Sequence, residues 1–315
     1  MSTTEESALL ARLDHPDPSE RQLAVMALED IASPAAVEPL IAAMADPDAT
    51  VRRLVVGLLE DLGDGRAAPA LIAALGDESS AVRAAAEAAL RELRDGAAAE
   101  ALLGAVAHPA AHVRRAVILA LRELRDGRAT DALIQALEDP ATDVRREAIV
   151  TLAYLRTPAA IPGLGRRLKD DDAGVRRLAL GALELFRGPA LLPSFIAALE
   201  DADWQVRAEA AIVLGRTALS QAVPGLLEAL DDPAWQVRKE AAIALGRLRA
   251  PAALPALLRL LDADVPDLRR TAASALGDLR AREAVPALDR LRLTDPDVEV
   301  KKTATRALAV IGDLP

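Results

Sequence analysis

The sequence contains no cysteine and only five aromatic residues among its 315 positions. Without cysteine there can be no disulfide framework, no thiolate metal site and no cysteine nucleophile, and this absence fits a reducing compartment such as the cytoplasm. With so few aromatic side chains, the core must consist of Ala, Leu, Val and Ile, which suits closely packed helices better than sheets. We therefore expect an all-α protein.

Long apolar runs and an excess of positive charge are also missing. No stretch nears the ~18 residues of a membrane span, and the first residues, MSTTEESALLARL, lack the basic and apolar regions of a secretion signal. We therefore expect a soluble, unprocessed, cytoplasmic protein with no membrane partner. The net charge of −10 opposes non-specific binding of nucleic acid, although a local basic patch could still operate.

Signatures of catalysis are absent as well. The sequence has no G-x-S-x-G, G-x-x-x-x-G-K-[ST], G-x-G-x-x-G or H-E-x-x-H motif. His108 and His112 have a spacing at which two imidazoles can share a metal, but a turn-capping His beside a solvated one is the simpler interpretation. The run 170–172 of three Asp lacks the spacing of a calcium loop. We predict no enzyme, no cofactor and no metal.

What the sequence does contain is an internal repeat. A basic residue, usually in the dipeptide Val-Arg, recurs at eight intervals of 31 residues and a last interval of 32. These residues are Arg21, Arg52, Arg83, Arg114, Arg145, Arg176, Arg207, Arg238, Arg269 and Lys301. A Leu follows each of them after seven positions, so ten copies of one unit fill the chain. This organisation overrides the two domains that the length alone would suggest.

Each copy predicts a pair of helices. Relative to the basic residue, apolar positions fall at −1, +3, +7 and +10, the spacing of a helix with one buried face. A second apolar segment, such as 67–75, precedes this helix and often has Pro in its first turn, where a missing N–H costs least. Asp-Pro turns, such as Asp46-Pro47, predict Asp as N-cap and Pro as the first helical residue. One pair cannot bury its apolar faces alone, so we expect all ten to stack into one solenoid over residues 1–315, without separate domains.

This unit, as in LGDGRAAPALIAALGDESSAVRAAAEAAL, resembles the HEAT-like repeats first associated with phycobilisome lyases, and the resemblance covers residues 5–311. It implies an α-solenoid wound as a right-handed superhelix, with the Val-Arg helices lining the concave surface. It also implies that the Asp six residues before each Arg forms buried pairs with Arg along the turns, with Arg145 and Asp139 as one pair. The ladder should be interrupted in copies one, four and nine, where the Asp is replaced by His15, His108 and Ala263. Some similar proteins are di-iron hydroxylases with His-Glu dipeptides as ligands, which this sequence lacks.

Two rows of positions lie opposite the core face of the Val-Arg helix. Each residue turns ~100° around the helix axis, so offset +1 lies about 200° from the core position −1. Offset +5 likewise lies about 200° from the core position +3. Seven of the ten residues at +1 are basic, and the +5 row includes Leu119, Val150 and two Ile. A groove that is both basic and apolar suits an acidic amphipathic peptide or protein surface. Equally, the basic residues could pair with nearby carboxylates, and the apolar ones could pack against the neighbouring repeat.

The only two tryptophans occupy the same place in consecutive copies, WQVRAEAAIVLGR and WQVRKEAAIALGR. We expect Trp204 and Trp235 to stand roughly 10 Å apart, as packed helices do, with Gly215 and Gly246 leaving space beside them. Trp with Arg nearby is a common composition of interface hot spots. The alternative is a recent duplication of a repeat that uses Trp to pack its turn.

The sequence thus predicts a non-enzymatic scaffold that binds a protein or an acidic amphipathic peptide on the concave face. The predicted anchors are Trp204, Gln205, Ile212, Trp235, Gln236 and Ile243, and the predicted complementary charges are Arg115, Arg146, Arg177, Lys239 and Arg270. One alternative, implied by the resemblance, is a tetrapyrrole (bilin) lyase or chromophore chaperone with Arg residues holding propionates, although no aromatic or His cluster marks such a pocket. Another is nucleic-acid backbone binding, as in similar HEAT-like DNA glycosylases, which the acidic composition and the few aromatics disfavour.

Overall fold

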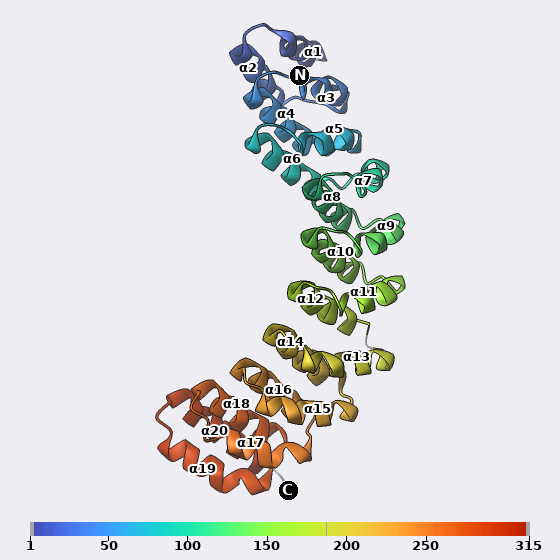
Figure 1. The fold of residues 1–315 in the computed structure, drawn as a ribbon. Coiled ribbons are helices and arrows are strands. Elements are labelled where there is room, and N and C mark those ends of the chain that lie inside the picture. The colour runs from blue at the N-terminus through green and yellow to red at the C-terminus, as the bar shows by residue number, and fades with distance from the viewer. Residues whose placement is uncertain (1–2, 187, 313–315) are drawn as a thin grey trace. The chain divides into compact units, whose positions relative to one another are not determined.

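A computed structural model describes residues 3–186 and 188–312, and these residues form α-helices and short 3₁₀ helices without any strand. The prediction of an all-α protein is confirmed. The α-helices follow one another in pairs along the chain (Figure 1), so each repeat contributes a first and a second helix.

The first helices are short, and all but the first of them follow a turn of 3₁₀ helix. They are α1 (Thr3–Ala11), α3 (Val37–Ala43), α5 (Ala68–Ala74), α7 (Ala99–Ala105), α9 (Thr130–Ala136), α11 (Ile161–Arg167), α13 (Leu192–Ala197), α15 (Val223–Glu228), α17 (Leu254–Leu260) and α19 (Val285–Thr294). The second helices carry the repeated basic residue. They are α2 (Pro18–Leu28), α4 (Ala49–Leu62), α6 (Ser80–Glu92), α8 (Ala111–Leu124), α10 (Thr142–Tyr154), α12 (Ala173–Glu184), α14 (Trp204–Thr217), α16 (Trp235–Arg247), α18 (Pro266–Asp278) and α20 (Val298–Gly312).

The chain consists of two compact units, residues 1–160 and 161–315, divided between the fifth and sixth helix pairs. Within each unit, every second helix packs against the next second helix and against the first helix of its own pair. This is the stacking expected of a solenoid. We predict a single undivided domain wound as a right-handed superhelix. Both statements depend on how the two units are arranged, so they stay predictions.

The core lies between the two helices of each pair. Val51, Val55 and Leu59 of α4, at offsets −1, +3 and +7, are fully buried, and the same offsets are buried in the second to the ninth repeat. Burying one such side chain stabilises the fold by roughly 1.5–3 kcal/mol. The predicted apolar face is therefore the core face of each second helix.

The second helices begin later than the Asp-Pro dipeptides predict. The N-cap of α4 is Asp48, and the carboxylate of Asp46 instead accepts the N–H of Asp48 at 2.8 Å, which leaves Pro47 outside the helix. The helices α10, α16 and α20 likewise start three residues after the Asp of their Asp-Pro turns. The predicted caps at these four turns are wrong because the Asp carboxylate has another role.

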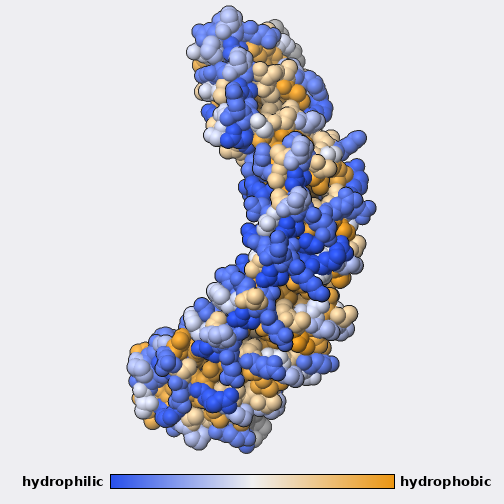
Figure 2. Space-filling view, in the orientation of Figure 1, coloured by the Kyte–Doolittle hydropathy of each residue, from blue (hydrophilic) through white to orange (hydrophobic). Residues whose placement is uncertain are grey.

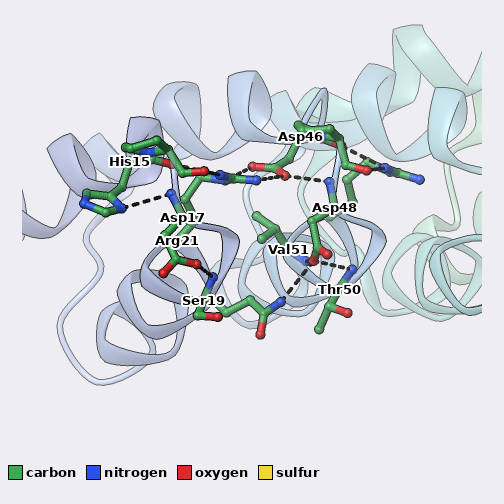
Figure 3. Close-up of polar contacts among 12 residues, drawn as sticks. His15, Asp17, Ser19, Arg21, Asp46, Asp48, Thr50 and Val51 are labelled. Carbon is green, nitrogen blue, oxygen red and sulfur yellow. Dashed lines mark hydrogen bonds and ion pairs between the residues drawn. The ribbon is translucent and has the colours of Figure 1, made fainter.

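That role is to join consecutive repeats (Figure 3). Arg21 donates from Nε and Nη2 to the two carboxylate oxygens of Asp46 at 2.6 and 2.8 Å, and its Nη1 donates to the carbonyl oxygen of His15 at 2.8 Å. Equivalent two-point pairs are Arg52–Asp77, Arg114–Asp139, Arg176–Asp201, Arg207–Asp232 and Arg269–Asp295. Each Arg thus links the turn before its own helix to the turn of the next repeat.

The predicted ladder is confirmed, but its connectivity differs from the expected one. The carboxylate of Asp139 pairs with Arg114 of the preceding repeat, whereas Arg145 donates to the backbone carbonyl oxygen of Asp139 at 3.0 Å. Pairing therefore runs between repeats rather than within one. Each rung of the ladder therefore adds a two-point ion pair to the apolar contacts between consecutive helix pairs.

Two of the three predicted interruptions are found, at His108 and Ala263, but they affect Arg83 and Arg238 of the preceding repeats. The interruption predicted for copy one is wrong, because Arg21 pairs with Asp46. Where an Asp would stand, the Nδ1 atom of His108 accepts the N–H of Ala110 at 3.1 Å. The imidazole therefore replaces the turn-closing bond of the Asp but offers Arg83 no carboxylate, and Arg83 retains hydrogen bonds to two carbonyl oxygens of its own turn. Ala263 leaves Arg238 with the same backbone bonds only, among the described residues.

Candidate functional site

Side chains on the side of each second helix away from the core form a stripe. Offsets −3, +1, +5 and +9 from the repeated basic residue are i, i+4 neighbours, so they follow one another along one side of the helix. In the last four repeats they are Trp204, Ala208, Ile212 and Arg216 of α14; Trp235, Lys239, Ile243 and Arg247 of α16; Pro266, Arg270, Ser274 and Asp278 of α18; and Val298, Lys302, Arg306 and Val310 of α20. We call these residues the C-terminal stripe.

One end of the C-terminal stripe is an apolar edge. Trp204 and Trp235 are the first residues of α14 and α16, which pack side by side. The Trp204 side chain is 39% exposed, and Trp235 is half-buried. Pro266 and Val298 occupy the same position in the next two helices, and Val298 is 61% exposed. Consecutive repeats therefore present four large or rigid apolar side chains at their helix starts.

The glycines near the tryptophans do not leave open space. Gly215 and Gly246 are buried, and a Cβ atom on them would lie 2.8 Å from Cα of Ala244 and 3.0 Å from Cα of Ala275 respectively. The predicted space is absent because the next second helix fills it. These glycines instead allow α14, α16 and α18 to approach one another closely.

A cleft of about 410 Å³ lies further along the C-terminal stripe, between α16, α18 and α20. Three predicted site residues, Lys239, Ile243 and Arg270, meet there. The other lining residues are Thr271, Ser274, Gly277, Asp278, Thr303, Arg306, Ala307 and Val310. In Figure 2, apolar and hydrophilic surfaces alternate over the part of the molecule that α16–α20 form. The remaining predicted anchors, Trp204, Gln205, Ile212, Trp235 and Gln236, lie outside this cleft.

The predicted basic row is largely engaged in ion pairs within the chain. The pairs are Arg115 with Glu87 at 2.8 Å, Arg146 with Asp143 at 3.6 Å, Lys239 with Glu240 at 3.7 Å and Arg270 with Asp267 at 2.7 Å. The hydrogen bond from Arg270 holds the pKa of Asp267 below its ordinary value. Arg177 is exposed and lies near Glu209, whose pKa is raised by burial. This pattern fits the alternative in which basic residues pair with nearby carboxylates.

The five basic residues are also not one surface. Arg115 and Arg146 belong to the first unit, whereas Arg177, Lys239 and Arg270 belong to the second. Leu119 of the apolar row is buried, while Ile212 and Ile243 are half-buried. The candidate site, which comprises the C-terminal stripe and its cleft, is therefore confined to the second unit.

Sequence analysis missed Ser274, Thr303, Arg306 and Val310 of the cleft. The signal was the +5 row itself, which changes from Ile in two repeats to Ser274 and Arg306 in the last two. A short side chain between long ones indicates a hollow on a helical surface. Offset +9, which contributes Asp278 and Val310, lies on the same side of the helix as the +1 and +5 rows.

Metal and membrane sites can be assessed on the described residues. These contain no group of three or more His, Cys, Asp or Glu side chains that could hold a metal ion. The predicted capping role of His108 is confirmed, and Nε2 of His112 lies 3.1 Å from the carbonyl oxygen of Leu75. No described helix is long and apolar enough to cross a membrane.

Comparison with known proteins matches HEAT repeats to residues 6–91, 68–142, 130–196, 192–276 and 260–315. Similar solved structures include Kap95p with RanGDP (TM-score 0.66, 15% identity, 97% of this chain and 48% of that one). The Kap95–Nup1 complex has a TM-score of 0.65 at 17% identity, over 97% of this chain and 50% of that one. An engineered protein has a TM-score of 0.50 at 22% identity, over 100% of both chains. The chain thus spans about half the length of these Kap95 chains. The comparison with curated proteins found no match.

Proposed function

Because the chain belongs to the HEAT-repeat family, we propose that it is a non-enzymatic scaffold that binds a protein or peptide along the C-terminal stripe. Two of the similar structures are named for Kap95 with the protein partners RanGDP and Nup1. The matched family is a repeat family, and no catalytic family accompanies it. The phycobilisome-lyase subtype and the cytoplasmic location stay predictions.

The observation that carries this proposal is the exposure of Trp204 beside Trp235. An indole that is 39% exposed presents apolar area that association would remove from water, and Trp is among the residues most enriched in interface hot spots. Pro266 and Val298 continue the apolar edge over two further repeats. A partner that covers this edge would bury apolar side chains from four successive helices.

The alternatives gain no such support. The C-terminal stripe contains no His and no aromatic residue other than the two tryptophans, which is a poor lining for a bilin. The net charge of the chain is −10, which opposes the approach of a nucleic-acid backbone.

An affinity pull-down from a native lysate tests the proposal. The baits are the wild-type chain, the double variant Trp204→Ala/Trp235→Ala and the control Leu293→Ala, which removes a 63%-exposed apolar side chain from α19. We expect a partner that the wild type and the control retain and the double variant loses. With the purified partner, each Trp substitution should weaken binding by about 2 kcal/mol, or roughly 30-fold in Kd. Equal capture by all three folded baits would contradict the proposed site.

A further inference from the structure

The cleft between α16, α18 and α20 arises where short side chains meet. Ser274 takes the position that Ile212 and Ile243 take on the two preceding helices. At Gly277 a Cβ atom would lie 3.0 Å from Cβ of Ala307, so α18 and α20 approach each other closely there. Small and hydroxyl-bearing residues therefore form the floor, and long side chains stand around it.

The rim of this cleft is positively charged, although the chain as a whole carries a net charge of −10. Lys239, Arg270 and Arg306 line it together with a single carboxylate, Asp278. Charge complementarity therefore favours an anionic occupant and disfavours a basic one.

Two of the three rim cations, Arg270 and Arg306, can bind a ligand at little cost to the stability of the fold. Arg306 forms no hydrogen bond and no ion pair within 4.0 Å in the described part of the chain. Arg270 shares its guanidinium with Asp267, and both side chains are about half exposed. Such exposed pairs contribute little to stability, so a carboxylate from a ligand can compete for Arg270 without disturbing the fold.

The other residues that line the cleft can hydrogen-bond to an anion and contact apolar groups beside it. The hydroxyl groups of Thr271, Ser274 and Thr303 supply donors for carboxylate oxygens. Ile243 and Val310, the latter 44% exposed, supply apolar contacts at the same cleft. Trp235 of the apolar edge is the first residue of α16, the helix that also provides Lys239 and Ile243.

We propose that this cleft receives Asp or Glu side chains of an acidic amphipathic peptide whose apolar residues contact Trp204 and Trp235. The inference rests on the proposed function and adds the chemistry of the partner. Carboxylates would pair with Arg270 and Arg306, and adjacent apolar side chains would contact Trp204 and Trp235 of the apolar edge.

A phage-displayed library of random 12-residue peptides, selected on the full chain, tests this inference. Peptides from the wild type should be enriched at least two-fold in Asp and Glu over the starting library. The cleft variant Lys239→Gln/Arg270→Gln/Arg306→Gln should bind a labelled selected peptide at least ten-fold more weakly. The control Arg259→Gln/Arg280→Gln/Arg290→Gln removes the same charge outside the C-terminal stripe and should change binding less than two-fold. Circular dichroism verifies that each variant is folded.

The outcomes separate this inference from the proposed function. Selected peptides without acidic enrichment, or equal binding by the cleft and control variants, would overturn the cleft proposal even if Trp204→Ala/Trp235→Ala abolished binding. Binding that depends on the cleft but ignores the tryptophans would overturn the proposed function and the peptide contacts with Trp204 and Trp235, but not the pairing of carboxylates in the cleft. If labelled single-stranded DNA bound the cleft more tightly than any peptide, or if the wild type were a dimer and the cleft variant a monomer, the occupant would be a nucleic acid or a second copy, and the proposal would fail.

Discussion

At the scale of single residues, the repeated Arg connects backbone and side chain across two turns. Arg52 donates to the carbonyl oxygens of Asp46 and Pro47 in its own turn and to both carboxylate oxygens of Asp77 in the next. One planar guanidinium thus satisfies polar groups of two repeats, which a Lys with its single ammonium could not do in the same geometry. The free-energy contribution of each rung should therefore depend on both partners being present.

The interruption at His108 offers a way to measure one rung. His108→Asp gives Arg83 a two-point carboxylate partner while keeping an acceptor for the N–H of Ala110. We expect the free energy of unfolding to rise by roughly 1.5–3 kcal/mol, the range for hydrogen bonds to charged groups. Urea unfolding of the single variants and of Arg83→Ala/His108→Asp closes a double-mutant cycle. If His108→Asp raises the free energy of unfolding equally in the Arg83→Ala background, the new rung is not the source of the stabilisation.

The ladder also predicts a pH dependence. The hydrogen bond from Arg52 holds the pKa of Asp77 below its ordinary value, as that from Arg269 does for Asp295. Because the pKa in the folded state is lower than in the unfolded state, this stability is present above about pH 4 and is lost as the pH falls through the folded-state pKa. Asp77→Asn should therefore be less stable than the wild type at pH 7, and the difference should shrink towards pH 2. A constant difference in thermal unfolding across this range would exclude the ionised pair as the cause.

At the scale of helices, packing distance distinguishes the second unit. Gly215, Gly246 and Gly277 each bring their helix against an Ala of the next one, where an added Cβ would lie 3.0 Å or less from its atoms. Gly57 of α4 differs, because a Cβ atom added to it would have no neighbouring atom within 4 Å. The two glycine environments predict substitutions of opposite sign.

Gly246→Ala should destabilise the protein by roughly 1–3 kcal/mol, because α16 and α18 must move apart. Gly57→Ala should instead stabilise it by about 0.5–1 kcal/mol, because Ala favours a helix and the space is open. Chemical denaturation of both variants measures the two effects. Stabilisation by Gly246→Ala would mean that the close approach of these helices is not a feature of the folded protein.

These elements also show what the sequence can predict. The 31-residue spacing and the apolar offsets determine the helix pairs and their buried faces, because burial at −1, +3 and +7 requires only a helical period. Helix starts were predicted two residues too early because the Asp46 carboxylate bonds to the preceding repeat, a contact invisible within one unit. For the same reason the cleft was missed, since Ser274 forms its floor only when residues from α16 and α20 stand beside it.

At the scale of the whole molecule, the chain comprises two units of five helix pairs each, and the candidate site belongs to the second. Each unit has its own buried core, and nearest-neighbour packing supplies the stability of repeat proteins. The C-terminal stripe needs no residue from the first unit. Function and fold should therefore be separable by truncation at residue 160.

A fragment of residues 161–315 should fold by itself and bind the selected peptides within about three-fold of the full chain. Circular dichroism and a binding titration with the labelled peptide measure both properties. The complementary fragment, residues 1–160, should be helical and should not bind. A disordered second fragment would show that coupling between repeats reaches further than nearest neighbours.

The most direct test of the account uses the chain's own fluorescence. Its only two tryptophans are Trp204 and Trp235, so tryptophan emission reports on the proposed site and on no other part of the protein. As a selected peptide saturates the chain, the emission maximum should move to shorter wavelength, because the exposed indole of Trp204 leaves water. If the peptide label shows saturation while tryptophan emission stays unchanged, the tryptophans are not part of the binding surface, and the central claim of the proposed function is contradicted.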